Sequence, residues 1–333
     1  MGGGGSQAEL WMVGLAIDWF PSGGESIPEL SEGTFLGTIS VCSTLPVAGL
    51  INSERVSSRV NANELDFGVV VQKTLLMAMV FVPFLGTSLV RGDDSLLPIQ
   101  LKVLSYNIHH GEGTDSKLDL NRLAKIIQKV DPDLVALQEV DQNTRRTGVV
   151  NQIEVLAAQT GLFGQFAKQL DYGGGEYGQA ILSKHPIQAF KVHWLPGEPD
   201  RERRIVGVAE FQIHGNTFLF GTTHLHHARV DLREGQTREL DRLFAQGTLP
   251  MILAGDFNAS PDSQAIQMLQ QEWRMATSEP MPTFPAESPT RQLDYVVVRP
   301  ANSWRIVKAM VLDEPLASDH RPVLVELEWL GEN

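Results

Sequence analysis

Polar side chains that can bind metals or move protons recur at the ends of apolar runs. Asn107 closes LKVLSYN, Glu139 closes LVALQE and His224 closes TFLFGTTH. Asp256 and Asn258 follow the run MILAG and are in turn followed by Pro and Ser residues. One such residue alone is usually a solvated turn or a cap. If the strands are neighbours, however, their ends meet in one cleft, and the repetition predicts a shared site.

The donor types in this set favour a hard divalent cation. The set holds carboxylates, amides and histidines, with Asp319 and His320 before the last strand, and it contains no thiol. Oxygen-rich sites suit Mg²⁺ or Mn²⁺ better than a structural zinc. Mg²⁺ is usually held by one or two carboxylates together with waters and a substrate phosphate. The pattern therefore predicts that Asp256 and Asn258 are delivered to a metal–phosphate site with Mg²⁺ (or Mn²⁺) as cofactor.

Such a site has the groups needed to hydrolyse a phosphate ester. A divalent cation offsets charge that develops on a phosphoryl oxygen. A carboxylate within hydrogen-bond reach of a water molecule can act as a general base. A histidine held by a carboxylate keeps one tautomer and can become cationic in the transition state.

Other polar clusters carry a weaker signal. The pairs His109–His110 and His226–His227 could ligate a second, transition metal, but we expect them to line the cleft or face solvent. Arg146 lies in a charged cluster of the kind that is usually solvated, and it could instead grip an anionic substrate. The glycine-rich segment 172–178 lacks the lysine of a nucleotide-binding loop, so we interpret it as a flexible rim from which Tyr177 reaches the phosphate.

These residues are positioned by a mixture of helices and strands. Residues 118–130 have apolar side chains at helical spacing, Asp119 is a fair N-cap, and Pro132 stops the helix. Two more helices are predicted over 151–162 and 231–246. The mixture favours an α/β or α+β class with helices that cover the sheets. Strands are predicted over 101–108, 134–139, 178–184, 205–213, 217–227, 251–258, 293–298 and 321–329.

Seven segments, taken together, resemble the endonuclease/exonuclease/phosphatase superfamily, the group of deoxyribonuclease I, exonuclease III and neutral sphingomyelinases. The resemblance runs from about Leu101 to Leu327, in the family's motif order. It implies a four-layer α-β-β-α sandwich of two packed mixed sheets, with the site at the edge where strands end. The segments are LSYNIHHG, LQEVD, EYGQAILSK, TTHLHH, LAGDFNASPDS, RQLDYVVV and ASDHRPVLVELE.

The resemblance also implies metal ligands. Glu139 resembles the principal ligand, Asn107 matches the residue that the family places beside it, and Asp319 looks like an additional ligand.

The same resemblance implies roles in catalysis. Asp256 resembles the residue that orients or deprotonates the attacking water, while Asn258 and His224 resemble phosphate-binding residues. His320 resembles the histidine that contacts the scissile phosphate, and Asp294 the carboxylate that orients it. The completeness of this set favours an enzyme over the alternative, a non-catalytic binding module on the same fold.

Composition leaves the substrate open. The 333-residue chain has a net charge of −13, and no basic stripe with interleaved aromatic residues is present. A locally positive cleft could still accept nucleic acid; a phospholipid headgroup and an inositol phosphate are the other classes. The motifs look closest to exported bacterial members and to the lumenal domain of proteins that remodel glycosylphosphatidylinositol lipids, which favours the lipid class. No obligate protein partner is evident, and we expect a monomer.

The predicted catalytic domain covers residues 95–333. The sequence upstream of it differs in composition. Residues 74–90 form an uncharged, mostly apolar run between Lys73 and Arg91, the layout of a secretory signal peptide. A membrane anchor and a buried helix are the alternatives for 69–94. Residues 1–68 are predicted to be a poorly structured, over-called extension. The expectation is an exported enzyme, periplasmic or extracellular, or one anchored on the outer face; the single Cys42 forms no intrachain disulfide.

Overall fold

The computed structural model describes residues 99–198, 202–245, 247–277 and 279–331. The predicted extension and the predicted signal or anchor segment lie outside these residues and stay predictions. Among the helices that the structure describes, none is long and apolar enough to cross a membrane.

Two six-stranded mixed sheets form the centre of the catalytic domain. The first has the order β11-β12-β1-β2-β4-β3, with β1 and β2 parallel. The second has the order β5-β6-β7-β8-β10-β9, with β7 and β8 parallel. The first sheet consists of β1 (Ile99–Asn107), β2 (Leu134–Gln142), β3 (Phe163–Tyr172), β4 (Gly175–Ser183), β11 (Trp304–Val311) and β12 (Val323–Trp329). The second consists of β5 (Ala189–Trp194), β6 (Ile205–Ile213), β7 (Asn216–His224), β8 (Met251–Asp256), β9 (Arg274–Met275) and β10 (Asp294–Arg299).

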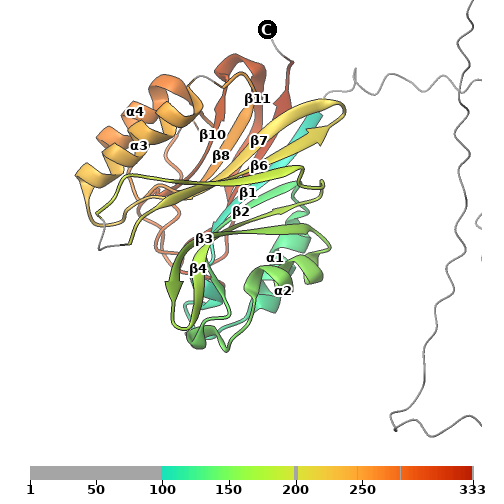
Figure 1. Cartoon of the computed structure of the whole chain (residues 1–333), viewed down its shortest axis with the longest axis vertical. Helices are drawn as coiled ribbons and strands as arrows, with labels where there is room; N and C mark the ends of the chain where they lie inside the picture. The colour runs from blue at the N-terminus through green and yellow to red at the C-terminus, as the bar shows by residue number, and fades with distance from the viewer. Residues whose placement is uncertain (1–98, 199–201, 246, 278, 332–333) are drawn as a thin grey trace, which may run out of the picture. The chain divides into compact units, whose positions relative to one another are not determined.

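Helices cover the outer face of each sheet (Figure 1). Asp119 caps the first helix by accepting a hydrogen bond from the Arg122 amide, as predicted, and the helix ends at Val130 before Pro132. The α1 and α2 helices pack on the first sheet, and α3 and α4 on the second. Their bounds are α1 (Leu120–Val130), α2 (Gln152–Thr160), α3 (Val230–Phe244) and α4 (Gln264–Glu272), with short 3₁₀ turns at His109–Gly111, Arg145–Thr147 and Ala301–Ser303.

Three apolar layers hold the sandwich together. The middle layer lies between the sheets and joins Val103 and Ala136 of the first to Phe220 and Ile252 of the second. An outer layer lies under each pair of helices. Because both faces of each central strand are buried, these strands read as continuous apolar runs. The four-layer sandwich predicted from the sequence is confirmed.

The structure corrects the sequence prediction in three places. The second predicted strand does not stop at Glu139 but continues to Gln142, with a register shift between Leu137 and Val140. Most of the glycine-rich segment is a hairpin rather than a loop, because the chain turns only at Gly173 and Gly174. The sequence analysis also missed α4 and the edge strands β3, β5, β9 and β11.

Candidate active site

Strand pairing brings the predicted site residues together. Asn107 pairs with Gln138 across the parallel strands β1 and β2. In the second sheet, His224 and Asp294 both pair with Asp256, from β7 on one side and from β10 on the other. The polar residues that end separate apolar runs in the sequence therefore meet at one edge of the sandwich, as predicted.

A bulge in β2 sets the direction of Glu139. The register shift lies between Leu137 and Val140, and Glu139 itself has a left-handed φ of 58°. Asn258, just after β8, has a φ of 49°. Non-glycine residues in this region cost free energy and gather where function requires an unusual direction. The backbone thus turns two candidate site residues away from the regular strand path.

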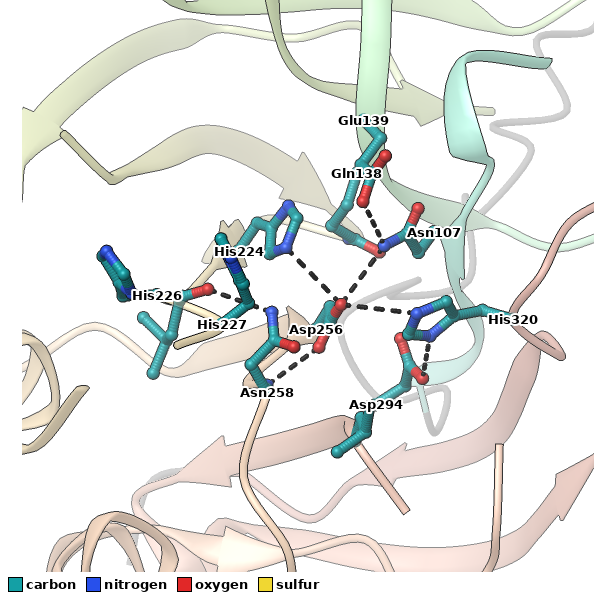
Figure 2. A network of polar contacts seen from close by, with 12 residues as sticks. Asn107, Gln138, Glu139, His224, His226, His227, Asp256, Asn258, Asp294 and His320 are labelled. Atoms are coloured by element: carbon teal, nitrogen blue, oxygen red, sulfur yellow. Dashed lines mark hydrogen bonds and ion pairs between the residues drawn. The ribbon is translucent and has the colours of Figure 1, made fainter. Parts of the chain in front are cut away.

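The Asn107 amide bridges two carboxylates at the centre of the site (Figure 2). Its Nδ2 donates to Glu139 Oε1 at 3.1 Å and to Asp256 Oδ2 at 3.2 Å. The Asn258 backbone N–H donates to Asp256 Oδ1 at 2.8 Å, so both oxygens of this buried carboxylate are engaged. The Asn258 side chain donates to the Leu225 carbonyl at 3.1 Å, which fixes the amide beside β7.

His320 is held by Asp294 in a buried pair. His320 Nδ1 lies 2.8 Å from Asp294 Oδ2, and the same oxygen accepts a hydrogen bond from Thr283 Oγ1. His320 Nε2 lies 3.7 Å from Asp256 Oδ2 and therefore points toward the centre of the site (Figure 2). The ring also packs against Phe284, with 4.8 Å between centroids. The orienting role implied for Asp294 thus has the required geometry.

Burial and neighbouring charges shift the pKa values of these groups in opposite directions. Burial lowers the pKa of His320, but the Asp294 and Asp256 carboxylates outweigh it and raise that pKa to about 10. Burial raises the pKa of Asp256 to about 7, although the His320 cation opposes the shift. Burial and the nearby Arg204 guanidinium lower the pKa of His224 well below its usual value. Near neutral pH, His320 is thus a cation, His224 is neutral, and Asp256 can accept a proton.

The donor set fits a divalent cation. Oxygens of Glu139 and Asp256 both come within 3.2 Å of one atom, Asn107 Nδ2, so two anionic donors converge on a small volume. Oxygen donors of this kind suit Mg²⁺ or Mn²⁺. Donor atoms of His109, His110 and Glu139 also lie within 4.8 Å of one another. Burial lowers the pKa of His110 to about 4, so its ring stays neutral, as a metal ligand must.

The remaining predicted residues occupy three different settings. Asp319 accepts a hydrogen bond from Ser318 at 3.3 Å, and no contact between described residues joins its carboxylate to the cluster. Tyr177 lines the catalytic pocket together with Glu139, Asp256 and His320. Arg146 lines an adjoining pocket, where its guanidinium is paired with the buried Asp141. The ligand role of Asp319 and the substrate-binding roles of Tyr177 and Arg146 stay predictions.

Arg204 also lines the catalytic pocket, a role that no pattern in the sequence assigned to it. Arg204 is 2% exposed, and its Nη1 atom lies 3.0 Å from Glu202 Oε1. Nε and Nη1 are buried without a hydrogen bond. Arg204 immediately precedes β6. In the sequence, this position next to the start of an apolar run is the feature that distinguishes it from Arg201 and Arg203.

Two kinds of relative match this chain. One is the uncharacterized protein YbhP of Escherichia coli strain K12, which is 24% identical over 260 residues, 70% of this chain and 98% of the relative. Among solved structures, an endonuclease/exonuclease/phosphatase family protein from Bacteroides thetaiotaomicron is 23% identical with a TM-score of 0.59, over 70% of this chain and 99% of that one. The mannosyl-6-phosphatase of Bacteroides thetaiotaomicron is 22% identical with a TM-score of 0.57, over 68% and 99%.

The model of the endonuclease/exonuclease/phosphatase family matches residues 104–320. This range contains all the site residues from Asn107 to His320, and it confirms the resemblance seen in the sequence motifs. Members of the family are divalent-metal-dependent hydrolases of phosphate esters. The chain belongs to the endonuclease/exonuclease/phosphatase family.

Proposed function

We propose that this protein is a divalent-metal-dependent phosphoesterase that hydrolyses a phosphodiester or a phosphomonoester by attack of water on phosphorus. One observation carries the proposal: a carboxylate that can accept a proton near neutral pH lies 3.7 Å from a histidine that is cationic at the same pH. A general base and a positive group for the developing phosphoryl charge are the two parts that the reaction needs.

The chain's own residues account for the proton and charge movements. The oxygen of a water molecule bonds to phosphorus while one of its protons passes to the Asp256 carboxylate. The bond from phosphorus to the alcohol oxygen breaks, and the leaving alcohol takes up a proton. His320, held by Asp294, donates a hydrogen bond to a phosphoryl oxygen as its charge rises. Asn258 and His224 border the same pocket and position the phosphate.

Glu139 would hold the cation, with the amide oxygen of Asn107, which accepts from the His109 backbone N–H, and the His109 and His110 rings as further ligands. When bound, the cation supplies Lewis-acid polarisation of a phosphoryl oxygen and offsets its negative charge. The identity of the cation is proposed as Mg²⁺ or Mn²⁺ on the chemistry of the donors.

The proposal covers monoesters as well as diesters, since a phosphatase has the same fold. We further propose that the enzyme acts as a monomer. We also propose that it is exported, on the strength of the apolar segment near residues 69–94.

A hydrolysis assay tests the proposed function. Purified protein is incubated with bis-p-nitrophenyl phosphate and with p-nitrophenyl phosphate, in Mg²⁺ or Mn²⁺, with and without an excess of EDTA. We expect release of p-nitrophenol that depends on the cation, disappears with EDTA and returns when the cation is added back. The control variant is Asp131→Asn, which removes an exposed carboxylate at the end of α1, outside the residues that line the site. Hydrolysis that survives exhaustive chelation would refute the metal-dependent mechanism.

A further inference from the structure

A second pocket opens beside the catalytic pocket, and we call it the side pocket. It has a volume of about 210 Å³. This is below the ~300–1,000 Å³ of pockets for drug-sized ligands, so it suits one ring rather than an extended chain. Its lining residues are Glu139, Arg146, Leu170, Tyr172, Tyr177 and Glu202.

The side pocket is continuous with the candidate active site. Glu139, Tyr177 and Glu202 line both pockets. Glu139 is also the carboxylate that accepts the hydrogen bond from Asn107 at the centre of the site. A group in the side pocket would therefore be joined to a phosphate in the catalytic pocket, as the alcohol part of the ester is.

The charges in the side pocket do not favour a second phosphate. Asp141 is buried and accepts from Arg146 Nε at 2.7 Å and from Nη2 at 2.8 Å, so this guanidinium is already neutralised. Among the residues that the structure describes, the other charged lining groups are the carboxylates of Glu139 and Glu202. Nucleic acids bind where lysines and arginines neutralise successive phosphates. The phosphate next to the scissile one would meet carboxylates here instead.

The polar atoms that remain in the side pocket match a group with several hydroxyls. Gln169 and Arg204 both contact Oε1 of Glu202, at 2.7 and 3.0 Å, so Oε2 is left to accept from a ligand. An ionised carboxylate only accepts, so its partner must carry O–H or N–H groups. Arg146 uses Nε and Nη2 on Asp141, which leaves Nη1 to donate. A hydroxyl group both donates and accepts, and it satisfies both lining residues.

An aromatic surface completes the side pocket. The Arg146 guanidinium lies 4.6 Å from the centroid of Tyr172 and 5.6 Å from that of Tyr177. Tyr172 ends β3, and the turn at Gly173 and Gly174 holds it in a tight hairpin, since both glycines have a positive φ. Tyr172 is still 45% exposed, so part of its ring remains to pack on the carbon skeleton of a ligand. Of the described residues, Leu170 is the single aliphatic one in the lining, too little apolar surface for an acyl chain.

We infer that the side pocket binds the alcohol part of the substrate and that this alcohol is an uncharged polyhydroxyl ring, a sugar or a cyclitol. The inference rests on the proposed function and narrows it, because it selects sugar and cyclitol phosphates over nucleic acid. Tyr172 and Glu202 act as specificity residues that contact the ring.

A matched pair of substrates tests this inference. Inositol 1-phosphate and cyclohexyl phosphate have the same carbon ring with and without hydroxyls, and each is also assayed as its methyl diester. We expect kcat/KM at least tenfold higher for the inositol ester, which corresponds to ~1.4 kcal/mol and therefore to more than one hydrogen bond. A thymidine oligonucleotide serves as the nucleic-acid arm. Equal rates for the two rings, or a preference for the oligonucleotide, would overturn the inference.

Two variants assign the preference to the side pocket. Tyr172→Ala removes a half-exposed ring, and Glu202→Gln keeps the shape of its side chain beside Gln169 and Arg204; thermal unfolding checks that both variants are folded. Glu202→Gln should lower the preference for the inositol ester over cyclohexyl phosphate about tenfold, whereas Tyr172→Ala, which removes packing on the carbon skeleton, should lower kcat/KM for both esters and leave the preference in place. The matched control is Phe163→Ala, an exposed aromatic residue at the other end of β3. Equal losses on both substrates in Glu202→Gln would mean that its carboxylate does not bind the hydroxyls and would overturn the inference.

Binding of the free alcohol separates this inference from the proposed function. Saturation-transfer NMR is recorded with inositol and with cyclohexanol. We expect a signal for inositol that Tyr172→Ala weakens and Phe163→Ala preserves. If no ester is hydrolysed but inositol still binds in this way, the proposed function fails and the side pocket remains a polyol site. If esters are hydrolysed but inositol gives no signal and no preference, the inference fails alone.

Discussion

Replacing Asp294 by Asn should move the alkaline limb of the pH–rate profile to lower pH. The Asp294 Oδ2 atom lies 2.8 Å from His320 Nδ1, and both residues are buried. A unit charge at about 4 Å is worth ~4 kcal/mol at an effective dielectric constant near 20, which is roughly three pKa units. The carboxylates raise the pKa of His320 to about 10, so loss of Asp294 should return it to roughly 7.

The sign of the effect follows from the active form of the histidine. If the cation stabilises the transition state, the rate is retained below the pKa of His320 and is lost as the pH rises through it. At pH 9 the variant should therefore retain roughly one part in a hundred of its plateau rate, while the wild-type enzyme retains most of its own.

The assay measures kcat as a function of pH, from pH 5 to 11, at a saturating cation concentration and with p-nitrophenyl phosphate esters as substrates. Thr283→Val, which removes a hydrogen bond to Asp294 but no charge, should shift the limb much less. The exposed Asp131 provides the charge-matched control, Asp131→Asn, with no expected shift. An alkaline limb that stays in place in Asp294→Asn would refute the idea that Asp294 governs the charge of His320.

Three further predictions test the metal site, the core and the chain's organisation. Glu139→Gln should raise the Mg²⁺ concentration needed for half-maximal rate, and an unchanged metal titration would remove Glu139 from the ligands. Trp304→Ala deletes a fully buried ring that packs on Phe218 and Trp329, so the free energy of unfolding in urea should fall by ~3–5 kcal/mol, against a small change for the exposed Val307→Ala. A chain that begins at Asp94 should unfold at the wild-type temperature and keep the wild-type rate, since every candidate site residue lies beyond it; an insoluble or inactive product would move the domain boundary.

The positions of the site residues could be predicted because strand ends are visible in the sequence. Asn107, His224 and Asp256 each close an apolar run, and the structure pairs those runs at one edge. Central strands are buried on both faces, so their apolar runs are unambiguous. The strands that the sequence analysis missed, β3, β5, β9 and β11, are the four sheet edges, where exposure weakens the pattern.

The finer geometry depends on contacts that the local sequence does not contain. The bulge at Glu139 arises from how β2 pairs with β4, so the strand predicted from the apolar pattern alone ends three residues too early. The left-handed φ values of His109 and His110 bring these rings toward Glu139, where the sequence favoured a pair that lines the cleft or faces solvent over a second metal site. The ion pair between Arg146 and Asp141 likewise depends on the 3₁₀ turn at Arg145–Thr147, which the local sequence did not predict.

The central claim is that Asp256 accepts the proton of the attacking water. The most direct measurement compares kcat of the wild-type enzyme and of Asp256→Asn on the fastest ester, at saturating cation and with matched thermal unfolding. Asparagine keeps the shape of the side chain but cannot accept the proton, so we predict a loss of ~10²–10⁴-fold. A properly folded Asp256→Asn enzyme that turns over at the wild-type rate would contradict the account.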